Sequence, residues 1–405
     1  MSSHVRQAVN EAVTRQHLVD CDLVVLGPDL VEPTTHQCVR HPSPWKLQRS
    51  NCLQPFRESH EQLRRRSLIS VCRCRQQKKS FRRLRRANAS VVTRVTPGIV
   101  GGIECRFVDP ANPENFRRAT DAKTRCYYAE TLPNPKLTVF PIGEVAKIGR
   151  ALGVPLIMDN TAAPVLCRPL DHGAAIVMHS TTKYIGGHGT SIGGILVDGG
   201  NFDWEKHKDR FPMLNTPDPS YHGAVWTQAV KPLGPIAYIL KARVTLLRDV
   251  GAPMSPFNAF MFLQGLETLP LRMRVHCDNA NAVAKHLGKN PKITKVIHPS
   301  AMSGEAKKRA EKYLSRGLGA LLGFELKGGV EAGRKFIDSL KMFYHVANIG
   351  DARSLAIHPA STTHSQLTPE EQAQTGVTPG YVRLSIGLEH IDDILADLDQ
   401  ALAAV

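Results

Sequence analysis

The sequence predicts an α/β protein whose large domain is built on a mostly parallel sheet, because short apolar segments alternate with longer stretches of helical periodicity. Polar residues close each apolar segment: Asp159 after 154–158, His179-Ser180 after 174–178, and Asp198 after 193–197. Short apolar runs separated by room for a helix are typical of buried parallel strands with helical crossovers. Because ligands bind beyond the carboxyl ends of such strands, Asp159 and Ser180 are candidate site residues.

A smaller C-terminal α/β domain is predicted from residue 256 onward. Residues 271–287 predict a helix with Pro270 near its start, because apolar residues recur along one face. Thr368-Pro369-Glu370-Glu371 predicts another helix start, with a capping threonine, a proline at the first helical position and a glutamate that reaches back. Apolar residues at i, i+3, i+4 and i+7 of residues 391–398 predict an amphipathic helix.

Residues 1–100 have a different composition, and we predict that they are irregular or disordered. They contain two glycines and no tyrosine, whereas the rest of the chain holds all eight tyrosines. They also hold 18 basic and 7 acidic residues, so they carry most of the net charge of +16. Apart from a possible short strand at 24–26, no apolar periodicity is sustained, and such segments bury too little apolar surface to offset chain entropy. The predicted units are therefore 1–100, 101–255 and 256–405.

The overall composition is that of a globular protein, at 42% hydrophobic and 22% charged residues. No apolar run approaches the roughly 18–20 residues that span a bilayer, and the first residues lack a secretory signal. The nine cysteines show neither a disulfide framework nor the spacing of a metal site. We therefore expect a cytoplasmic protein with reduced thiols and no metal, although the Arg-rich start leaves an organelle-targeting interpretation open.

A lysine at the end of a predicted strand carries the strongest chemical signal. In Ser180-Thr181-Thr182-Lys183-Tyr184-Ile185-Gly186-Gly187-His188-Gly189, hydroxyl residues precede the lysine and glycines follow it. Hydroxyls can donate to a phosphate, and glycines let the backbone approach a ligand closely. A partly desolvated lysine is nucleophilic toward an aldehyde. Taken alone, Lys183 could equally be an exposed charge at a strand end.

Asp159, at the end of the preceding strand, offers the partner that this chemistry needs. A carboxylate there can keep a pyridine nitrogen protonated, so that the ring remains an electron sink. Alone, Asp159 would be read as a cap of the following helix. Lys183 and Asp159 on successive strands together favour a pyridoxal 5'-phosphate site.

Five motifs in the predicted order resemble the Cys/Met-metabolism family of fold-type I pyridoxal-phosphate (PLP) enzymes over about residues 102–405. They are Glu130–Leu137 (ETLPNPKL), Asp159-Asn160-Thr161, Ser180–Gly189, Ile349–Ala360 with Thr362–Leu367, and Val382–Gly387. The Ile349–Ala360 motif is most similar to the O-acetylhomoserine sulfhydrylase branch. The resemblance implies fold type I, in which a mostly parallel large domain is followed by a smaller C-terminal domain.

The resemblance also assigns roles to individual residues. Lys183 would bind the cofactor as a Schiff base and shuttle protons, and Asp159 would pair with the pyridinium. The other implied contacts are Ser180 and Thr182 to the phosphate, Asn134 to the ring hydroxyl, Thr161 along the ring, and Arg383 with Ser354 to the substrate carboxylate. Asn134 before a proline could instead be a plain turn residue, and Arg383 could be a surface ion-pair residue.

The implied reaction is γ-replacement, in which acetate leaves O-acetylhomoserine and sulfide or a thiol adds to give homocysteine. A cystathionine or methionine lyase of the same family is the nearest alternative. A nucleic-acid-binding protein that uses the basic segment between Arg64 and Arg86 is an alternative of another class, although no aromatic residues interleave with those arginines. The family resemblance further implies a homo-oligomer, a tetramer in intact relatives.

The first segment of the family, which normally supplies a Tyr-x-Arg, a glycine loop under the phosphate and a tyrosine stacked on the ring, has no match in residues 1–100. Three interpretations remain open: a shifted reading frame, a genuine replacement, or a functional basic arm. The first two predict weak cofactor binding, since phosphate donors and one wall of the ring pocket would be missing.

Overall fold

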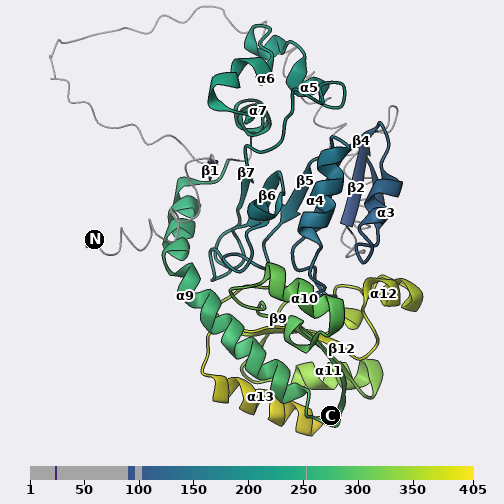
Figure 1. Cartoon of the computed structure of the whole chain (residues 1–405). Coiled ribbons are helices and arrows are strands. Elements are labelled where there is room, and N and C mark those ends of the chain that lie inside the picture. Colours follow the sequence, from purple (N-terminus) through teal and green to yellow (C-terminus); the bar gives the residue numbers. More distant parts are fainter. Residues whose placement is uncertain (1–22, 25–89, 96–102, 252) are drawn as a thin grey trace, which may run out of the picture.

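Seven strands form the larger sheet in the computed structural model, which describes residues 23–24, 90–95, 103–251 and 253–405 (Figure 1). Their order across the sheet is β1-β7-β6-β5-β4-β2-β3. The strands are β1 Leu23–Val24, β2 Ser90–Val95, β3 Ile103–Val108, β4 Thr124–Glu130, β5 Leu156–Asp159, β6 Ile176–Ser180 and β7 Gly194–Asp198. The three strands predicted from the apolar runs are thus confirmed as β5, β6 and β7.

The larger sheet is mixed, which corrects the expectation of a mostly parallel sheet. Only the β4–β5 and β5–β6 pairings are parallel among the described strands. β7 runs antiparallel to β6, with Ser180 paired to Gly194. A parallel return needs a crossover, usually a helix, whereas residues 181–193 form turns without a helix. The chain therefore reverses direction after β6, and β7 pairs antiparallel with β6.

Part of the segment predicted to be irregular belongs to the sheet. β2 lies between β3 and β4 and pairs antiparallel with both. β1 pairs antiparallel with β7 and starts one residue earlier than the short strand predicted at 24–26. The disorder predicted for the remainder of residues 1–100 lies outside the described residues.

The crossover between β4 and β5 is α4, Ile142–Ala151, which covers one face of the large sheet together with α3, Glu114–Ala119 (Figure 1). Its apolar positions Ile142, Val145 and Ile148 are buried, whereas Glu144 is exposed. This spacing of 3 to 4 residues turns one helix face toward the strands. Because α4 joins β4 to β5, both strands end at the same edge of the sheet.

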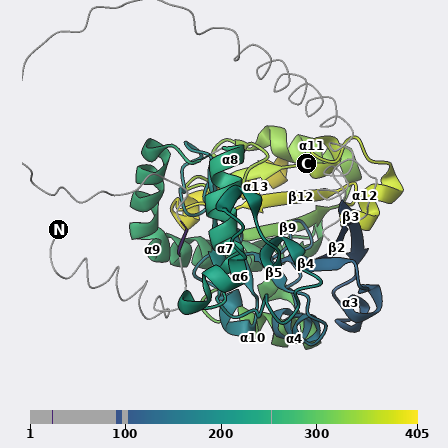
Figure 2. The same ribbon diagram turned by 90° about the horizontal axis from the view of Figure 1, so that it is seen from above.

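A group of short helices lies beyond the opposite edge of the large sheet, as the views in Figure 1 and Figure 2 show. They are α5 Pro212–Asn215, α6 Trp226–Ala229, α7 Ala237–Lys241 and α8 Arg248–Val250. Trp204 and Trp226 anchor a separate small core there. Within the described ranges, no helix combines the length and apolar character needed to cross a membrane.

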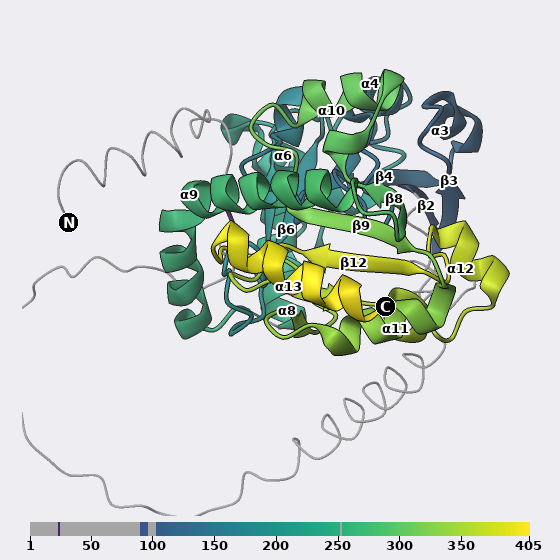
Figure 3. The same ribbon diagram turned by 90° about the horizontal axis from the view of Figure 1, so that it is seen from below.

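The C-terminal unit is built on a five-stranded sheet in the order β10-β11-β12-β9-β8. The strands are β8 Ile293–Ile297, β9 Leu321–Leu326, β10 Tyr344–His345, β11 Leu355–Ile357 and β12 Tyr381–Ser385. Figure 3 shows α9, α13 and α11 lying over this sheet. Their bounds are Pro256–Leu287, Ile391–Ala404 and Gly329–Ser339, and α10 spans Gly304–Tyr313.

Two of the three predicted C-terminal helices are confirmed. α12, Pro369–Thr375, starts with the capping box of Thr368 and Glu371, and α13 extends the predicted tail helix. The predicted start of the third near Pro270 is wrong, because α9 begins at Pro256 and contains Pro270. The start signal is Ser255, whose hydroxyl accepts the Asn258 N–H at 3.1 Å, followed by proline at the first helical position.

Candidate active site

Three polar side chains stand at one edge of the larger sheet, where β4, β5 and β6 end. Glu130, Asp159 and Ser180 are the last residues of these strands. Glu130 is in register with Asp159, and Asp159 with Met178. This edge faces the C-terminal unit in Figure 1. The strand-end positions predicted for Asp159 and Ser180 are therefore confirmed.

Asp159 is held by two donors. The Tyr128 hydroxyl donates to Asp159 Oδ2 at 3.1 Å, and the backbone N–H of Thr161 donates to Oδ1 at 2.9 Å. The Thr161 hydroxyl in turn accepts the Ser180 N–H at 2.8 Å. Thr161 thus ties the end of β6 to the turn that follows Asp159. These bonds fix the carboxylate in one orientation at the end of the strand.

Lys183 lies in a tight turn after β6. The N–H of Gly187 donates to Lys183 O at 2.7 Å, and Gly187 and Gly189 have φ of 75° and 65°, which glycine adopts readily. The Lys183 ammonium donates to the side-chain oxygen of Asn348, in the C-terminal unit. The lysine therefore meets a residue from the other unit across the sheet edge.

Arg272 of α9 stabilises this turn through hydrogen bonds to its backbone. Its guanidinium donates to the carbonyls of Tyr184 at 2.7 Å and Ile185 at 3.1 Å, and to Gly265 O at 2.7 Å. Arg272 is only 9% exposed, and burial lowers its pKa from the ordinary value. Charge-assisted bonds to three carbonyls make α9 the support of the lysine turn.

Gly265 lets α9 approach that turn closely, which predicts a large effect of a small change. A Cβ atom at residue 265 would lie 2.1 Å from the Ile185 carbonyl oxygen. We expect Gly265→Ala to lower the free energy of unfolding by about 1–3 kcal/mol, since backbone must shift. Urea unfolding measures this. Gly288→Ala, where the nearest atom would be 3.3 Å away, is the matched control and should have a smaller effect. Equal effects would contradict the prediction.

Arg383 on β12 and Asn348 bring the C-terminal unit to the site. Arg383 Nη2 donates to the Asn348 carbonyl at 2.8 Å, and Arg383 is only 8% exposed. Burial lowers the pKa of Arg383 to about 10, so the guanidinium stays charged at neutral pH. Its Nε has no hydrogen-bond partner among the described residues. A buried charge with an unused donor is suited to binding a carboxylate.

Ser354 is predicted to assist Arg383, and in this structure its side chain contacts Glu389. It is fully buried, and its hydroxyl donates to Glu389 Oε2 at 2.9 Å and accepts the Gly387 N–H at 2.9 Å. These bonds occupy the hydroxyl within the C-terminal unit. In this chain the Ser354 hydroxyl supports the loop through Glu389 and Gly387. The contact of Ser354 with the substrate carboxylate stays a prediction.

The residues present fit a PLP molecule in part. The buried Asn134 Oδ1 has no partner among the described residues, and the hydroxyl of a pyridine ring would supply one. Asp159 offers a negative charge to a ring nitrogen and Lys183 an amine to the aldehyde. The Thr182 hydroxyl accepts the Gly193 N–H at 3.0 Å and donates to the Gly193 carbonyl at 3.3 Å, so it closes the loop. No described residue supplies the tyrosine stack that the family resemblance implies from its first segment.

Four residues of this edge were not predicted from the sequence: Tyr128, Glu130, Arg272 and Asn348. Tyr128 and Glu130 share one face of β4, and only the register with β5 shows that they lie beside Asp159. Arg272 could have been noticed as a charged residue among apolar positions of a helix. Asn348 directly precedes a motif already quoted, but its contact with Lys183 depends on how the two units meet.

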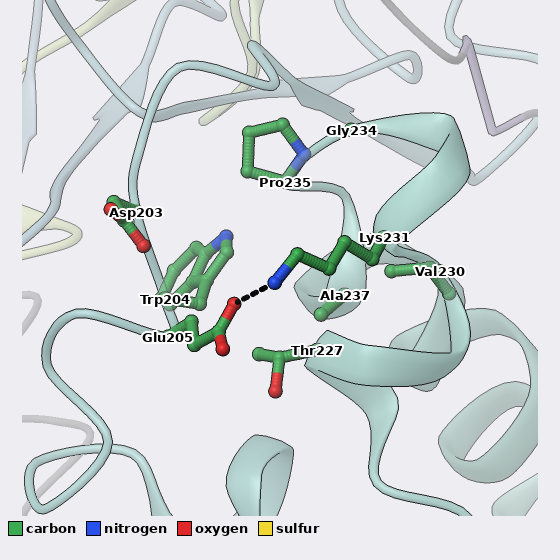
Figure 4. A pocket seen from close by; sticks show the side chains of 9 residues that line it. All are labelled: Asp203, Trp204, Glu205, Thr227, Val230, Lys231, Gly234, Pro235 and Ala237. Carbon is green, nitrogen blue, oxygen red and sulfur yellow. Dashed lines mark hydrogen bonds and ion pairs between the residues drawn. The ribbon is translucent and has the colours of Figure 1, made fainter.

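A surface pocket lies far from this edge, among the short helices. Its volume is about 200 Å³, and Figure 4 shows Trp204 and Pro235 on its wall. Lys231 Nζ and Glu205 Oε2 form an ion pair of 3.5 Å across it. Trp204 follows β7, which ends at the opposite edge because it runs antiparallel to β6. This pocket is therefore separate from the candidate active site.

The amine of Lys183, the carboxylate of Asp159 and the buried guanidinium of Arg383 are the groups that a PLP-dependent enzyme with an amino-acid substrate needs. The model of the family "Cys/Met metabolism PLP-dependent enzyme" matches residues 87–403, so the match begins before residue 102. The O-acetyl-L-homoserine sulfhydrylase of Leptospira meyeri is 57% identical over 308 residues, which cover 74% of this chain and 69% of that protein. The homocysteine/cysteine synthase of Saccharomyces cerevisiae is 42% identical over 316 residues, covering 75% and 70%.

A solved structure is also similar. A Campylobacter jejuni protein assigned as an O-acetylhomoserine (thiol)-lyase, crystallised with pyridoxyl-lysine-5'-monophosphate in its chain, has a TM-score of 0.68 and 39% identity. The match covers 74% of this chain and 70% of that one. The chain belongs to the Cys/Met metabolism family of PLP-dependent enzymes.

Proposed function

We propose that this protein makes homocysteine from O-acetylhomoserine and sulfide, or the corresponding thioether from a thiol. The observation that carries the proposal is 57% identity over 308 residues with a relative named O-acetyl-L-homoserine sulfhydrylase. The relatives named homocysteine synthase, including that of Schizosaccharomyces pombe at 48% identity, support the same product.

Each residue then has a definite task. Pyridoxal phosphate, when bound, withdraws electrons from the amino acid and so makes its Cα proton acidic. Asp159 would hold the ring nitrogen, oriented by Tyr128 and Thr161. The Lys183 amine would move protons at Cα and Cβ, and Arg383 would bind the α-carboxylate. Ser180, Thr182 and Asn134 would hold the phosphate and the ring hydroxyl, and Thr161 would line the ring. The acetate at Cγ is then the group that sulfide replaces.

Product analysis tests this function. The chain supplied with pyridoxal phosphate, O-acetyl-L-homoserine and sulfide should form homocysteine and acetate in equal amounts. Without sulfide, homocysteine should be absent. Cystathionine alone or methionine alone should yield no thiol product. Thiol formation from either of these substrates, with none from O-acetylhomoserine plus sulfide, would instead establish the lyase.

We also propose a homo-oligomer, a homotetramer as the family resemblance implies, located in the cytoplasm. An exposed apolar surface on α9 supports self-association: Phe257, Phe260, Leu263, Leu266 and Leu271 all face solvent in the single chain. Contiguous apolar surface of this kind marks protein interfaces. Cys167 and Cys277 are buried thiols outside any disulfide, as expected in a reducing compartment. Sedimentation analysis measures the oligomeric state.

A further inference from the structure

A second carboxyl group stands next to Asp159 at the sheet edge. Glu130 ends β4 directly opposite Asp159 in the parallel pairing of β4 with β5. Tyr128 lies two residues earlier on the same face, and its hydroxyl reaches Asp159. The resemblance assigns Glu130 no role. Two acids on neighbouring strand ends cannot both ionise without mutual repulsion unless a cation lies between them.

Hydrogen bonds distinguish the two acids. Asp159 accepts from the Tyr128 hydroxyl at 3.1 Å and from the Thr161 N–H at 2.9 Å. Glu130 accepts one longer bond, from the Asn134 N–H at 3.4 Å. Donors stabilise the ionised form of a carboxyl group. The geometry therefore leaves the negative charge on Asp159 and the proton on Glu130.

The surroundings of Glu130 agree with this assignment. Desolvation, followed by the charge of Asp159, raises the pKa of Glu130 to about 7. The other ionisable groups nearby are Tyr128 on the same strand, with a pKa raised by burial, and His179 on β6, whose pKa burial lowers to about 4. Both are neutral at pH 7.

We propose that Glu130 is the proton reservoir of the cofactor site: it holds a proton beside ionised Asp159 and releases it when a ring nitrogen becomes protonated there. The proton that Glu130 loses offsets part of the proton that the nitrogen gains, so a pyridinium can form with less uptake from solvent. The total charge of the group stays the same, because two carboxylates then face one cation where one carboxylate faced a neutral ring. This inference rests on Asp159 being the ligand of the ring nitrogen. Glu130 is a positioning residue, because it acts through Asp159.

Infrared difference spectroscopy of the cofactor-free chain tests whether Glu130 holds a proton beside Asp159. The carbonyl band of a protonated carboxylic acid, obtained as wild type minus Glu130→Gln, should titrate with a midpoint of about 7. In the Asp159→Asn background the midpoint should fall toward the ordinary glutamate value of about 4.3. Glu305→Gln, at an exposed glutamate, should give no such band near neutrality. A missing Glu130 band at pH 6, or one that ignores Asp159→Asn, would overturn the proposal.

Calorimetry of pyridoxal 5'-phosphate binding in buffers of different ionisation enthalpy tests whether Glu130 releases its proton when the cofactor binds. At pH 7 the wild type should take up about half a proton less than Glu130→Gln, since a group with a pKa of about 7 is half protonated there. Equal proton counts would overturn the release, as would a wild type that fails to bind the cofactor at saturation. A chain that passes both tests yet forms no homocysteine would refute the proposed function and leave this inference standing.

Discussion

Lys183→Ala is expected to lower homocysteine formation by about 10³-fold and to remove the covalent link to the cofactor. Its amine is the proposed attachment point and the proposed base, and a positioned base alone contributes roughly 10²–10⁴-fold. The readouts are product formation and the imine absorbance before and after borohydride reduction. Lys147→Ala, at an exposed lysine of α4, is the matched control and should keep both.

A reduced cofactor adduct that persists in Lys183→Ala would show that another lysine holds the cofactor. Unchanged melting temperatures of both variants would establish that the losses do not arise from unfolding. Loss of the imine in Lys147→Ala as well would contradict the assignment.

Arg383→Ala should reduce kcat/KM for O-acetylhomoserine by about 10²–10³-fold, because truncating one partner of a buried charge pair costs about 2–5 kcal/mol. The KM for sulfide should change little, since sulfide carries no carboxylate. Arg383→Lys should restore only part of the loss, because an ammonium lacks the planar fork of a guanidinium. Steady-state kinetics with each substrate varied in turn separates the two constants.

Arg334→Ala, at an exposed arginine of α11, serves as the control for the loss of a positive charge. If Arg383→Ala raised the KM of sulfide as much as that of the amino acid, the side chain would be shaping the loop around Asn348 and not binding the carboxylate.

The sequence allowed the strand ends to be predicted because apolar runs and their polar closing residues are local patterns. Asp159 and Ser180 stand where these patterns placed them. The direction of β7 could not be obtained in this way, since it depends on whether residues 181–193 form a helix. The helix predicted from Pro270 is shorter than α9, because the apolar periodicity begins after the Ser255-Pro256 start signal.

Contacts between segments that are distant along the chain could not be predicted for a different reason. Ser354 matched a family motif, but whether its hydroxyl reaches the site depends on Glu389, which lies in another segment. Asn348 and Lys183 are far apart along the chain and meet only after the two sheets are assembled. A one-dimensional pattern holds no information on such pairings.

The bonds from Arg272 to the carbonyls of Tyr184 and Ile185 have a consequence for protein engineering. The turn that contains Lys183 cannot be moved alone to another protein, because its shape depends on an arginine contributed by a remote helix. Grafting the SxTK stretch onto another scaffold would therefore require transplanting the segment from Gly265 to Arg272 with it, as one inseparable module.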